Sequence, residues 1–287
     1  MLNVYFLINE LVVLALFLIC FVHAAQHGWS GVARLLSGVA FGLLLEVATI
    51  RQLQAYHYGT FGVMVFDVPV MVAVAWGCIA YSAMTFSNAT RLPEWARPIF
   101  DGLLALNIDL AMDAVAIRLG MWDWGQGLRF NYFGVPFANF WAWFWVIVSF
   151  SAGYRLAALI RGRGGRALAP FAAVTIGLAG VLATNALIAF VIPFAWHGPL
   201  VAATLIAALV IVLTQRPKLP RGAPPPTWAV PLGFHAYFLV AGLTSGVILQ
   251  PPFLLVASLA MIVLALLIHG WYPQLRRRPP FASQGNS

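Results

Sequence analysis

The sequence has very little charge, and this scarcity excludes most water-soluble folds. Only 8% of its 287 residues are Asp, Glu, Lys or Arg, whereas 62% are hydrophobic. A chain with so few polar side chains cannot cover the surface of a soluble globule of this size. The composition therefore predicts a multi-pass membrane protein.

Cysteine and clustered histidine are scarce as well. The two cysteines, Cys20 and Cys78, lie in apolar runs, which favours neither a disulfide framework nor a thiolate metal site. His23 and His27 are four residues apart, but the other four histidines are scattered singly. Because a di-iron site needs clustered histidines, we expect no metal oxidase or desaturase.

Long apolar segments predict an all-α transmembrane bundle of about nine spans. A helix needs about 20 residues to cross ~30 Å of hydrocarbon at 1.5 Å per residue. The first segment lacks the basic start and cleavage site of a signal peptide, so we expect a retained span. We predict one domain over residues 1–275 and a short basic cytoplasmic tail at 276–287. The predicted spans are 4–25, 31–50, 61–86, 98–118, 135–158, 167–191, 198–214, 228–249 and 253–271.

The basic residues predict the orientation of the bundle. With nine spans, most of them fall on one side of the membrane, which should be cytoplasmic. We therefore place the chain in a bacterial-type cytoplasmic membrane with its N-terminus outside and its C-terminus inside. Because these residues are dispersed over loops, they argue against nucleic-acid binding. They are Arg91, Arg97, Arg155, Arg161, Arg163, Arg166, Arg216, Lys218, Arg221, Arg276, Arg277 and Arg278.

Two stretches of the chain share a pattern at a constant offset of 67 positions, which predicts an internal repeat. The repeat units, about 31–86 and 98–153, each contain two predicted spans and therefore run parallel. A pseudo-twofold axis along the membrane normal would bring the equivalent acids Glu46 and Asp113 together across a central crevice. The equivalent residues are Leu43, Glu46, Ile50, Arg51, Phe66, Val68, Pro69 and Trp76 in the first unit and Leu110, Asp113, Ile117, Arg118, Phe133, Val135, Pro136 and Trp143 in the second.

Acidic side chains concentrate in the outer half of the predicted bundle. Ionised carboxylates are costly in hydrocarbon, so acids within spans are candidates for a functional site. Asp109 and Asp113 are four residues apart and share a helix face. The alternative is that Glu46 and Asp113 form ion pairs with Arg51 and Arg118 that lock the helix ends. Five of the eight acids belong to this half: Glu46, Asp67, Asp109, Asp113 and Asp123.

Aromatic and amide side chains surround these acids. An interfacial aromatic belt explains part of them equally well. Asn139 is harder to explain in that way, because an amide in the first turns of a span needs a hydrogen-bond partner. We expect it to bind an acid or a water molecule in the crevice. The surrounding residues are Tyr56, His57, Tyr58, Trp122, Trp124, Asn131, Tyr132, Asn139, Trp141 and Trp143.

The residues around the second acid resemble a known family. They read Asp113-Ala114-Val115-Ala116, Gly120-x-Trp122-x-Trp124, Tyr132-Phe133-Gly134-Val135-Pro136-x-x-Asn139-Phe140 and Trp143. Over about residues 40–150 the chain is similar to the membrane-embedded carotenoid 1,2-hydratases, which are often labelled only as carotenoid biosynthesis proteins. Ala114 and Ala142 depart from the family pattern, which has proline and glycine there.

The resemblance implies that water adds across the terminal C1=C2 double bond of an acyclic carotenoid, without redox chemistry, metal or cofactor. The implied partners are a lipophilic polyene or isoprenoid from the bilayer, membrane lipids and other carotenoid enzymes. An alkene is protonated by a well-positioned acid, aromatic faces stabilise the tertiary cation, and a carboxylate or amide positions the capturing water. We assign proton donation to Asp113 or Asp109 and the handling of water to Glu46, Asp67 and Asn139. Substrate contacts are assigned to Tyr58, Trp122, Trp124, Tyr132, Trp143 and Arg118.

Two other function classes fit parts of the sequence. Asn107, Asp109 and Asp113 loosely match an aspartate-rich motif of intramembrane prenyltransferases, which hold Mg²⁺ against a diphosphate. Asn107 lies two residues from Asp109, however, and so points roughly opposite. Magnesium dependence with diphosphate release would distinguish this alternative. A small-molecule transporter is the non-catalytic alternative, since repeats and buried acids suit it too.

Overall fold

The computed structural model describes residues 3–130, 132–160, 162–218 and 223–270, and the described chain is mostly helical. The predicted helical membrane bundle is thus confirmed, whereas Asn131, Arg161, Arg221 and the predicted basic tail at 276–287 lie outside the described residues. The long helices are α1 (Val4–Gln26), α2 (Gly28–Leu53), α3 (Val70–Ala89), α4 (Arg97–Arg118), α5 (Phe137–Ala158), α6 (Arg163–Ala186), α7 (His197–Thr214), α8 (Pro225–Ser245) and α9 (Pro252–Ala265). The short elements are β1 (His57–Tyr58), β2 (Met64–Val65), β3 (Val68–Pro69), β4 (Trp122–Asp123), η1 (Glu94–Ala96), η2 (Leu187–Val191), η3 (Phe194–Trp196), η4 (Val247–Leu249) and η5 (Leu266–Gly270).

Seven of these helices are long and apolar enough to cross a membrane, so the count of nine predicted spans is only partly matched within the described chain. The helices that fall short are α4 and α5, although each has 22 residues. Helix α4 carries three aspartates, and α5 carries Asn139 among its tryptophans. Both helices are largely buried against other helices, so their polar side chains face protein.

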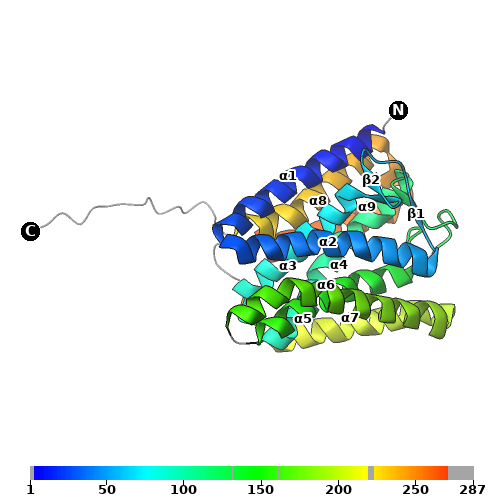
Figure 1. Ribbon diagram of the computed structural model, residues 1–287. Helices are drawn as coiled ribbons and strands as arrows, with labels where there is room; N and C mark the ends of the chain where they lie inside the picture. Colours follow the sequence, from blue (N-terminus) through cyan, green and yellow to red (C-terminus); the bar gives the residue numbers. More distant parts are fainter. Residues whose placement is uncertain (1–2, 131, 161, 219–222, 271–287) are drawn as a thin grey trace, which may run out of the picture.

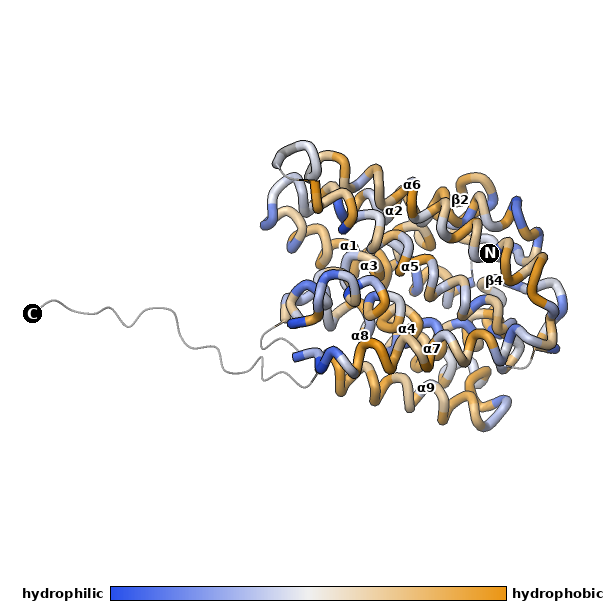
Figure 2. Tube along the Cα trace, turned by 90° about the horizontal axis from the view of Figure 1, so that it is seen from below, coloured by the Kyte–Doolittle hydropathy of each residue, from blue (hydrophilic) through white to orange (hydrophobic). Residues whose placement is uncertain are grey.

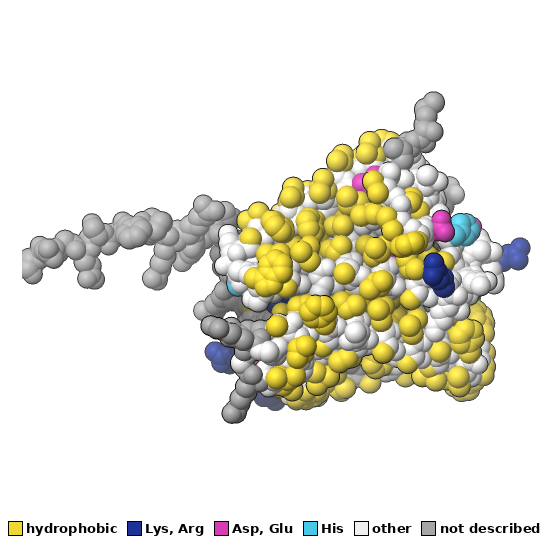
Figure 3. Space-filling model, viewed as in Figure 1, with side chains coloured by type: hydrophobic (Ala, Val, Ile, Leu, Met, Phe, Trp, Pro, Cys, Tyr) yellow, Lys and Arg dark blue, Asp and Glu magenta, His cyan; other side chains and the backbone are white. Residues whose placement is uncertain are grey.

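The helices lie side by side and run along broadly one direction, with α1 inclined to α2 (Figures 1 and 2). Helix α4 packs against α3, α5, α8 and α9, which places it in the interior of the bundle. Hydrophobic side chains cover most of the lateral surface in Figure 3, and charged side chains gather toward its two ends. This distribution suits a bundle surrounded by lipid, with its polar groups at the two membrane faces.

Two long connections, 54–69 and 119–136, meet at one end of the bundle, which we call the hairpin end. Strand β1 pairs antiparallel with β4, and this pairing joins the two connections. Strands β2 and β3 form a tight hairpin directly before α3. The prediction that a span begins at residue 61 is therefore wrong, because residues 64–69 form the β2–β3 hairpin and α3 begins at Val70.

The connections before α3 and α5 have the same backbone geometry at an offset of 67 residues. Phe66 and Phe133 both adopt left-handed φ angles, of 51° and 50°. Val65 pairs with Val68 in the first connection, and Tyr132 pairs with Val135 in the second. Each connection ends in a proline that caps the following helix, Pro69 before α3 and Pro136 before α5.

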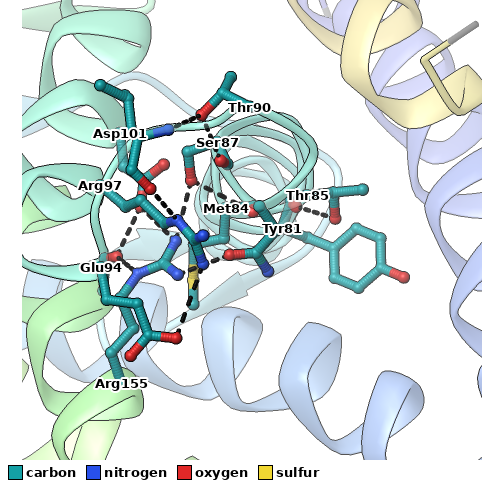
Figure 4. A network of polar contacts seen from close by, with 12 residues as sticks. Tyr81, Met84, Thr85, Ser87, Thr90, Glu94, Arg97, Asp101 and Arg155 are labelled. Carbon is teal, nitrogen blue, oxygen red and sulfur yellow. Dashed lines mark hydrogen bonds and ion pairs between the residues drawn. The ribbon is translucent and has the colours of Figure 1, made fainter. Parts of the chain in front are cut away.

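A buried ionic network fixes the opposite end of the bundle (Figure 4). Arg155 on α5 forms an ion pair of 3.1 Å with Asp101 on α4, and its guanidinium donates to Ser87 on α3 at 2.9 Å. The hydroxyl of Ser151 donates to the same Asp101 oxygen at 2.6 Å. Because these contacts connect α3, α4 and α5, they set the relative positions of the three helices that bear most of the candidate site.

Candidate active site

A large, partly open cavity lies toward the hairpin end of the bundle. It has a volume of about 940 Å³ and is lined by residues from eight long helices, α1 to α8, and from both long connections. That volume is at the upper end of the range of small-molecule sites. Most of the lining is apolar or aromatic, and Glu46, Asp113 and Asn139 bring polar groups into it. The predicted meeting of Glu46 and Asp113 at one crevice is thus seen in the structure.

Glu46 of α2 is bound by three donors. Its Oε2 accepts from the hydroxyls of Tyr56 and Tyr58 at 2.6 and 2.8 Å, and its Oε1 accepts from the indole N–H of Trp76 at 2.7 Å. Burial, and then the adjacent Glu46 carboxyl, raise the pKa of Tyr56 and of Tyr58 well above the usual value for tyrosine. Both phenols therefore remain protonated donors at neutral pH. Three donors leave about one of the four lone-pair positions of the carboxylate free.

Asp109 and Asp113 of α4 form a buried carboxyl pair. The amide nitrogen of Asn139 donates to Asp113 at 2.6 Å and to Asp109 at 3.1 Å, so one side chain binds both carboxyl groups. Two carboxyl groups held this close in a buried site favour sharing one proton over both being ionised. Asp113 lines the cavity, whereas Asp109 is fully buried behind it. The expected hydrogen bond of Asn139 to an acid is present.

The arginines near these acids do not neutralise them. Arg118 donates to the backbone carbonyls of Ala114, Phe133 and Gln250 at 2.7, 2.6 and 3.1 Å. It therefore fixes the 119–136 connection to α4. In the described chain the ion pairs are Arg97–Glu94 and Arg155–Asp101, both at the opposite end. The alternative that Glu46 and Asp113 form ion pairs with Arg51 and Arg118 is therefore wrong for the described residues.

Aromatic faces form the walls beside the acids. The rings of Trp76 and Trp143 lie 4.3 Å apart between centroids, and both line the cavity. The ring of Tyr58 packs edge-on against that of Trp122, and the ring centroids of Tyr56 and Trp124 lie 5.0 Å apart. Such faces can stabilise a cation that forms within about 6 Å of a ring.

Of the predicted catalytic residues, Asp113, Glu46 and Asn139 line the cavity, Asp109 contacts Asp113 from behind, and Asp67 lies elsewhere. Asp67 is exposed at the β2–β3 turn with φ of 65°. Its equivalent at the 67-residue offset is Gly134, with φ of 88°. A left-handed turn position explains both residues without a catalytic role.

Of the predicted substrate contacts, the structure brings four to the cavity: Tyr58, Trp122, Trp124 and Trp143. Tyr132 lies outside it and donates to the carbonyl of Leu110 at 2.8 Å. Burial raises the pKa of Tyr132 to about 12, with a further contribution from Asp109. Arg118 also lies outside, in a smaller cavity near the surface.

Two of the residues that donate to Glu46 are absent from the predicted site: Trp76 and Tyr56. Trp76 is the equivalent of Trp143 at the 67-residue offset, so the pattern could have identified it. Tyr56 was recognised only as one of many aromatic residues near the acids.

Asn107 takes no part in the site. Its amide donates to the carbonyl of Met261 at 3.1 Å, and its oxygen lies 3.0 Å from Nε2 of His235. These partners belong to α9 and α8. The asparagine of the prenyltransferase-like motif is therefore not assembled with Asp109 and Asp113. In the described residues, no group of three or more His, Cys, Asp or Glu side chains is arranged to hold a metal ion.

Comparison with known proteins gives one family match. A family described as carotenoid biosynthesis protein matches residues 2–164, which is more than half of the chain. The matched region contains α1 to α5 and therefore all of the acids of the site. No curated protein and no solved structure gives a significant match.

Proposed function

The chain belongs to the carotenoid biosynthesis protein family, and we propose that it hydrates the terminal C1=C2 double bond of an acyclic carotenoid. The observation that carries this proposal is the buried Asp109–Asp113 carboxyl pair. Its member Asp113 lines the same cavity as Glu46, whose carboxyl group is bound by three donors. Two carboxyl groups in such different surroundings suit an acid and a base acting in one reaction.

Asp113 donates the proton. It reaches the cavity, whereas Asp109 is enclosed behind it and keeps the shared proton in place. The proton passes from the Asp113 carboxyl to C2 as the C1=C2 π bond breaks, which leaves a tertiary cation at C1. Asn139 stabilises the carboxylate that remains, because its amide donates to both aspartates.

The aromatic walls stabilise the cation. Trp76 and Trp143 form a close pair beside the acids, with their ring planes tilted by 40°, and an indole ring is the best aromatic partner for a cation. Most of the remaining lining is apolar or aromatic, which suits a polyene chain.

Glu46 completes the reaction. The oxygen of a water molecule bonds to C1 while the Glu46 carboxylate accepts one of the water protons at its remaining lone pair. The product is a tertiary alcohol, and the two carboxyl sites return to their starting states by exchanging protons with water. The balance is one carotenoid plus one water giving one hydrated carotenoid.

The two helix pairs, α2–α3 and α4–α5, are related units of an internal repeat in this proposal. The equivalent turns at Phe66 and Phe133, with equal φ angles and equivalent strand pairing, support this relation. Equivalent residues also meet at both ends of α3 and α5. The rings of Trp76 and Trp143 contact each other at a tilt of 40°, and Arg155 donates to Asn88, its equivalent at the 67-residue offset, at 2.5 Å. Contacts between equivalent residues are expected along a pseudo-twofold axis.

The hairpin end faces away from the cytoplasm in this proposal. Arg91, Arg97, Arg155, Arg216 and Lys218 follow or precede the turns of the opposite end, which supports a cytoplasmic placement of that end. A C-terminal green fluorescent protein fusion should fluoresce, and a C-terminal alkaline phosphatase fusion should be inactive. The reverse result would contradict this orientation.

Expression in a lycopene-producing bacterial host tests the proposed reaction. Cells with the wild-type chain should accumulate pigment heavier by the mass of one water, and cells with Asp113→Asn at the same protein level should not. Unchanged pigment in cells with abundant wild-type protein would contradict the proposal, and so would equal conversion by the Asn variant.

A further inference from the structure

We propose that Asn185 and Thr49 form the site that holds the attacking water molecule. This inference rests on the proposed hydration and adds two side chains to it: Thr49 from α2, and Asn185 from α6, which lies beyond the region matched by the family. Both side chains line the cavity. Neither residue is among the acids or aromatic side chains described above.

Asn185 is a buried amide without a partner in the described structure. Its side chain is 1% exposed and its Nδ2 has no hydrogen-bond acceptor among the described residues. Buried amide groups in proteins are nearly always hydrogen-bonded, so an unsatisfied donor at a cavity wall marks a place for a polar ligand. A helix crossing apolar surroundings would accommodate leucine at this position more easily.

The position of Asn185 is set by its neighbours. One residue earlier, the carbonyl of Thr184 accepts from the indole N–H of Trp141 at 3.0 Å. Three residues before Asn185, the carbonyl of Leu182 accepts from the Gln52 amide of α2 at 2.9 Å. These two bonds fix α6 between α2 and α5, so Asn185 is held at the cavity by rigid helices rather than by a loop.

Thr49 supplies a second unsatisfied group from α2. Threonine hydroxyls within helices commonly donate to a carbonyl of the preceding turn, as Thr85 donates to Tyr81 at 2.6 Å. Thr49 Oγ1 has no such partner in the described residues, although the side chain is 8% exposed. The hydroxyl is therefore available as both donor and acceptor. Thr49 also lies three residues after Glu46, on the same face of α2.

A water molecule matches this set of groups. Buried water needs two to four polar partners, and the Asn185 amide, the Thr49 hydroxyl and the free lone pair of Glu46 supply three. Donors at Asn185 and Thr49 would hold the water oxygen while Glu46 accepts a proton from it. Water so held is ready to bond to a cation formed at the Asp113 side of the same cavity.

A water site at Asn185 and Thr49 predicts an outcome that a purely structural role of these two residues does not. Without the water site, Asp113 still protonates the alkene, but the cation loses a proton again instead of gaining oxygen. In D₂O, that reversal leaves deuterium in the recovered carotenoid, because the cation carries hydrogen and deuterium together at C2. Hydration and deuterium exchange should therefore separate in the variants.

The experiment uses the purified full-length protein in detergent micelles with lycopene in D₂O. For Asn185→Leu and for Thr49→Val, we expect hydration to slow by about 10-fold to 100-fold while deuterium still enters recovered lycopene. The ratio of exchange to hydration rises by the same factor. Thr49→Ser, which keeps the hydroxyl, should restore hydration.

Thr184→Val is the matched control. It lies next to Asn185, its hydroxyl donates to the carbonyl of Val181 at 3.1 Å, and it does not line the cavity. It should behave like the wild type. Equal losses of exchange and hydration in Asn185→Leu and Thr49→Val would overturn the water site, as would wild-type hydration in both. Wild-type protein that neither hydrates lycopene nor exchanges deuterium would instead refute the proposed function itself.

Discussion

Replacing Asp113 with Asn tests the proposed proton donor with little disturbance of its surroundings. The amide has the shape of the carboxyl group and keeps an oxygen that can accept from the Asn139 amide. An amide cannot release a proton to an alkene, however. A general acid contributes about 10²-fold to 10⁴-fold to a rate, so we expect a loss of that size in hydration. This loss corresponds to about 3–5 kcal/mol of transition-state stabilisation.

The assay is the initial rate of hydrated carotenoid formed per folded protein, with the midpoint of thermal unfolding measured in the same detergent. Asp109→Asn should cost less activity than Asp113→Asn, because Asp109 is fully buried behind the cavity wall. Asp101→Asn is the control at the opposite end, where it weakens the ion pair with Arg155. Breaking a buried pair costs about 3–5 kcal/mol of stability, and the rate per folded molecule should stay unchanged. An Asp113→Asn variant that kept more than about a tenth of the wild-type rate would refute the acid role.

Three further predictions follow from single contacts. Trp76→Phe removes the donor to Glu46 Oε1 and should slow hydration about tenfold, measured as an initial rate, since a hydrogen bond to a charged group contributes about 1.5–3 kcal/mol. Gly42→Val should lower both the unfolding midpoint and the rate, because a Cβ at residue 42 would lie 2.6 Å from the Cβ of Trp76; Gly164→Ala, which meets nothing within 4 Å, is the control. The pKa of Tyr132, raised from 10 to about 12, favours the neutral phenol in the folded state, so its contribution to stability is present below pH 10 and lost as the pH rises toward 12. Tyr132→Phe should flatten the fall of the unfolding midpoint across that pH range, and an unchanged slope would contradict this assignment.

The sequence allowed the helical bundle and the centre of the site to be predicted, because both depend on regular spacing. The four-residue spacing of Asp109 and Asp113 fixed their shared face, and the offset of 67 residues related Glu46 to Asp113. Burial of Asn139 in a span required a polar partner, and the structure provides both aspartates. Such arguments use only local geometry and the cost of unsatisfied polar groups.

Residues governed by backbone turns or by distant helices could not be placed in that way. The predicted depth of Asp67 grouped it with the acids of the site. The left-handed turn before α3 directs the chain so that the Asp67 side chain is exposed instead. The guanidinium of Arg118 binds three backbone carbonyls, and nothing in the sequence around it distinguishes that role from substrate binding. The contribution of α6 to the cavity depends on how α6 packs against α2 and α5, which spacing alone does not determine.

The proposed repeat also explains how equivalent acids could acquire different roles. Gly42 of α2 and Asp109 of α4 are equivalent positions, four residues before Glu46 and Asp113. The absent side chain at Gly42 lets α3 approach closely, so that the Trp76 indole reaches Glu46 as a donor. At the second position, the Asp109 carboxyl fills the corresponding place, and the Asn139 amide binds it together with Asp113. In the proposed reaction this pair shares a proton. One difference between the units thus surrounds the first acid with donors and gives the second a partner acid, which is the asymmetry that addition of a proton and a water to opposite ends of one double bond requires.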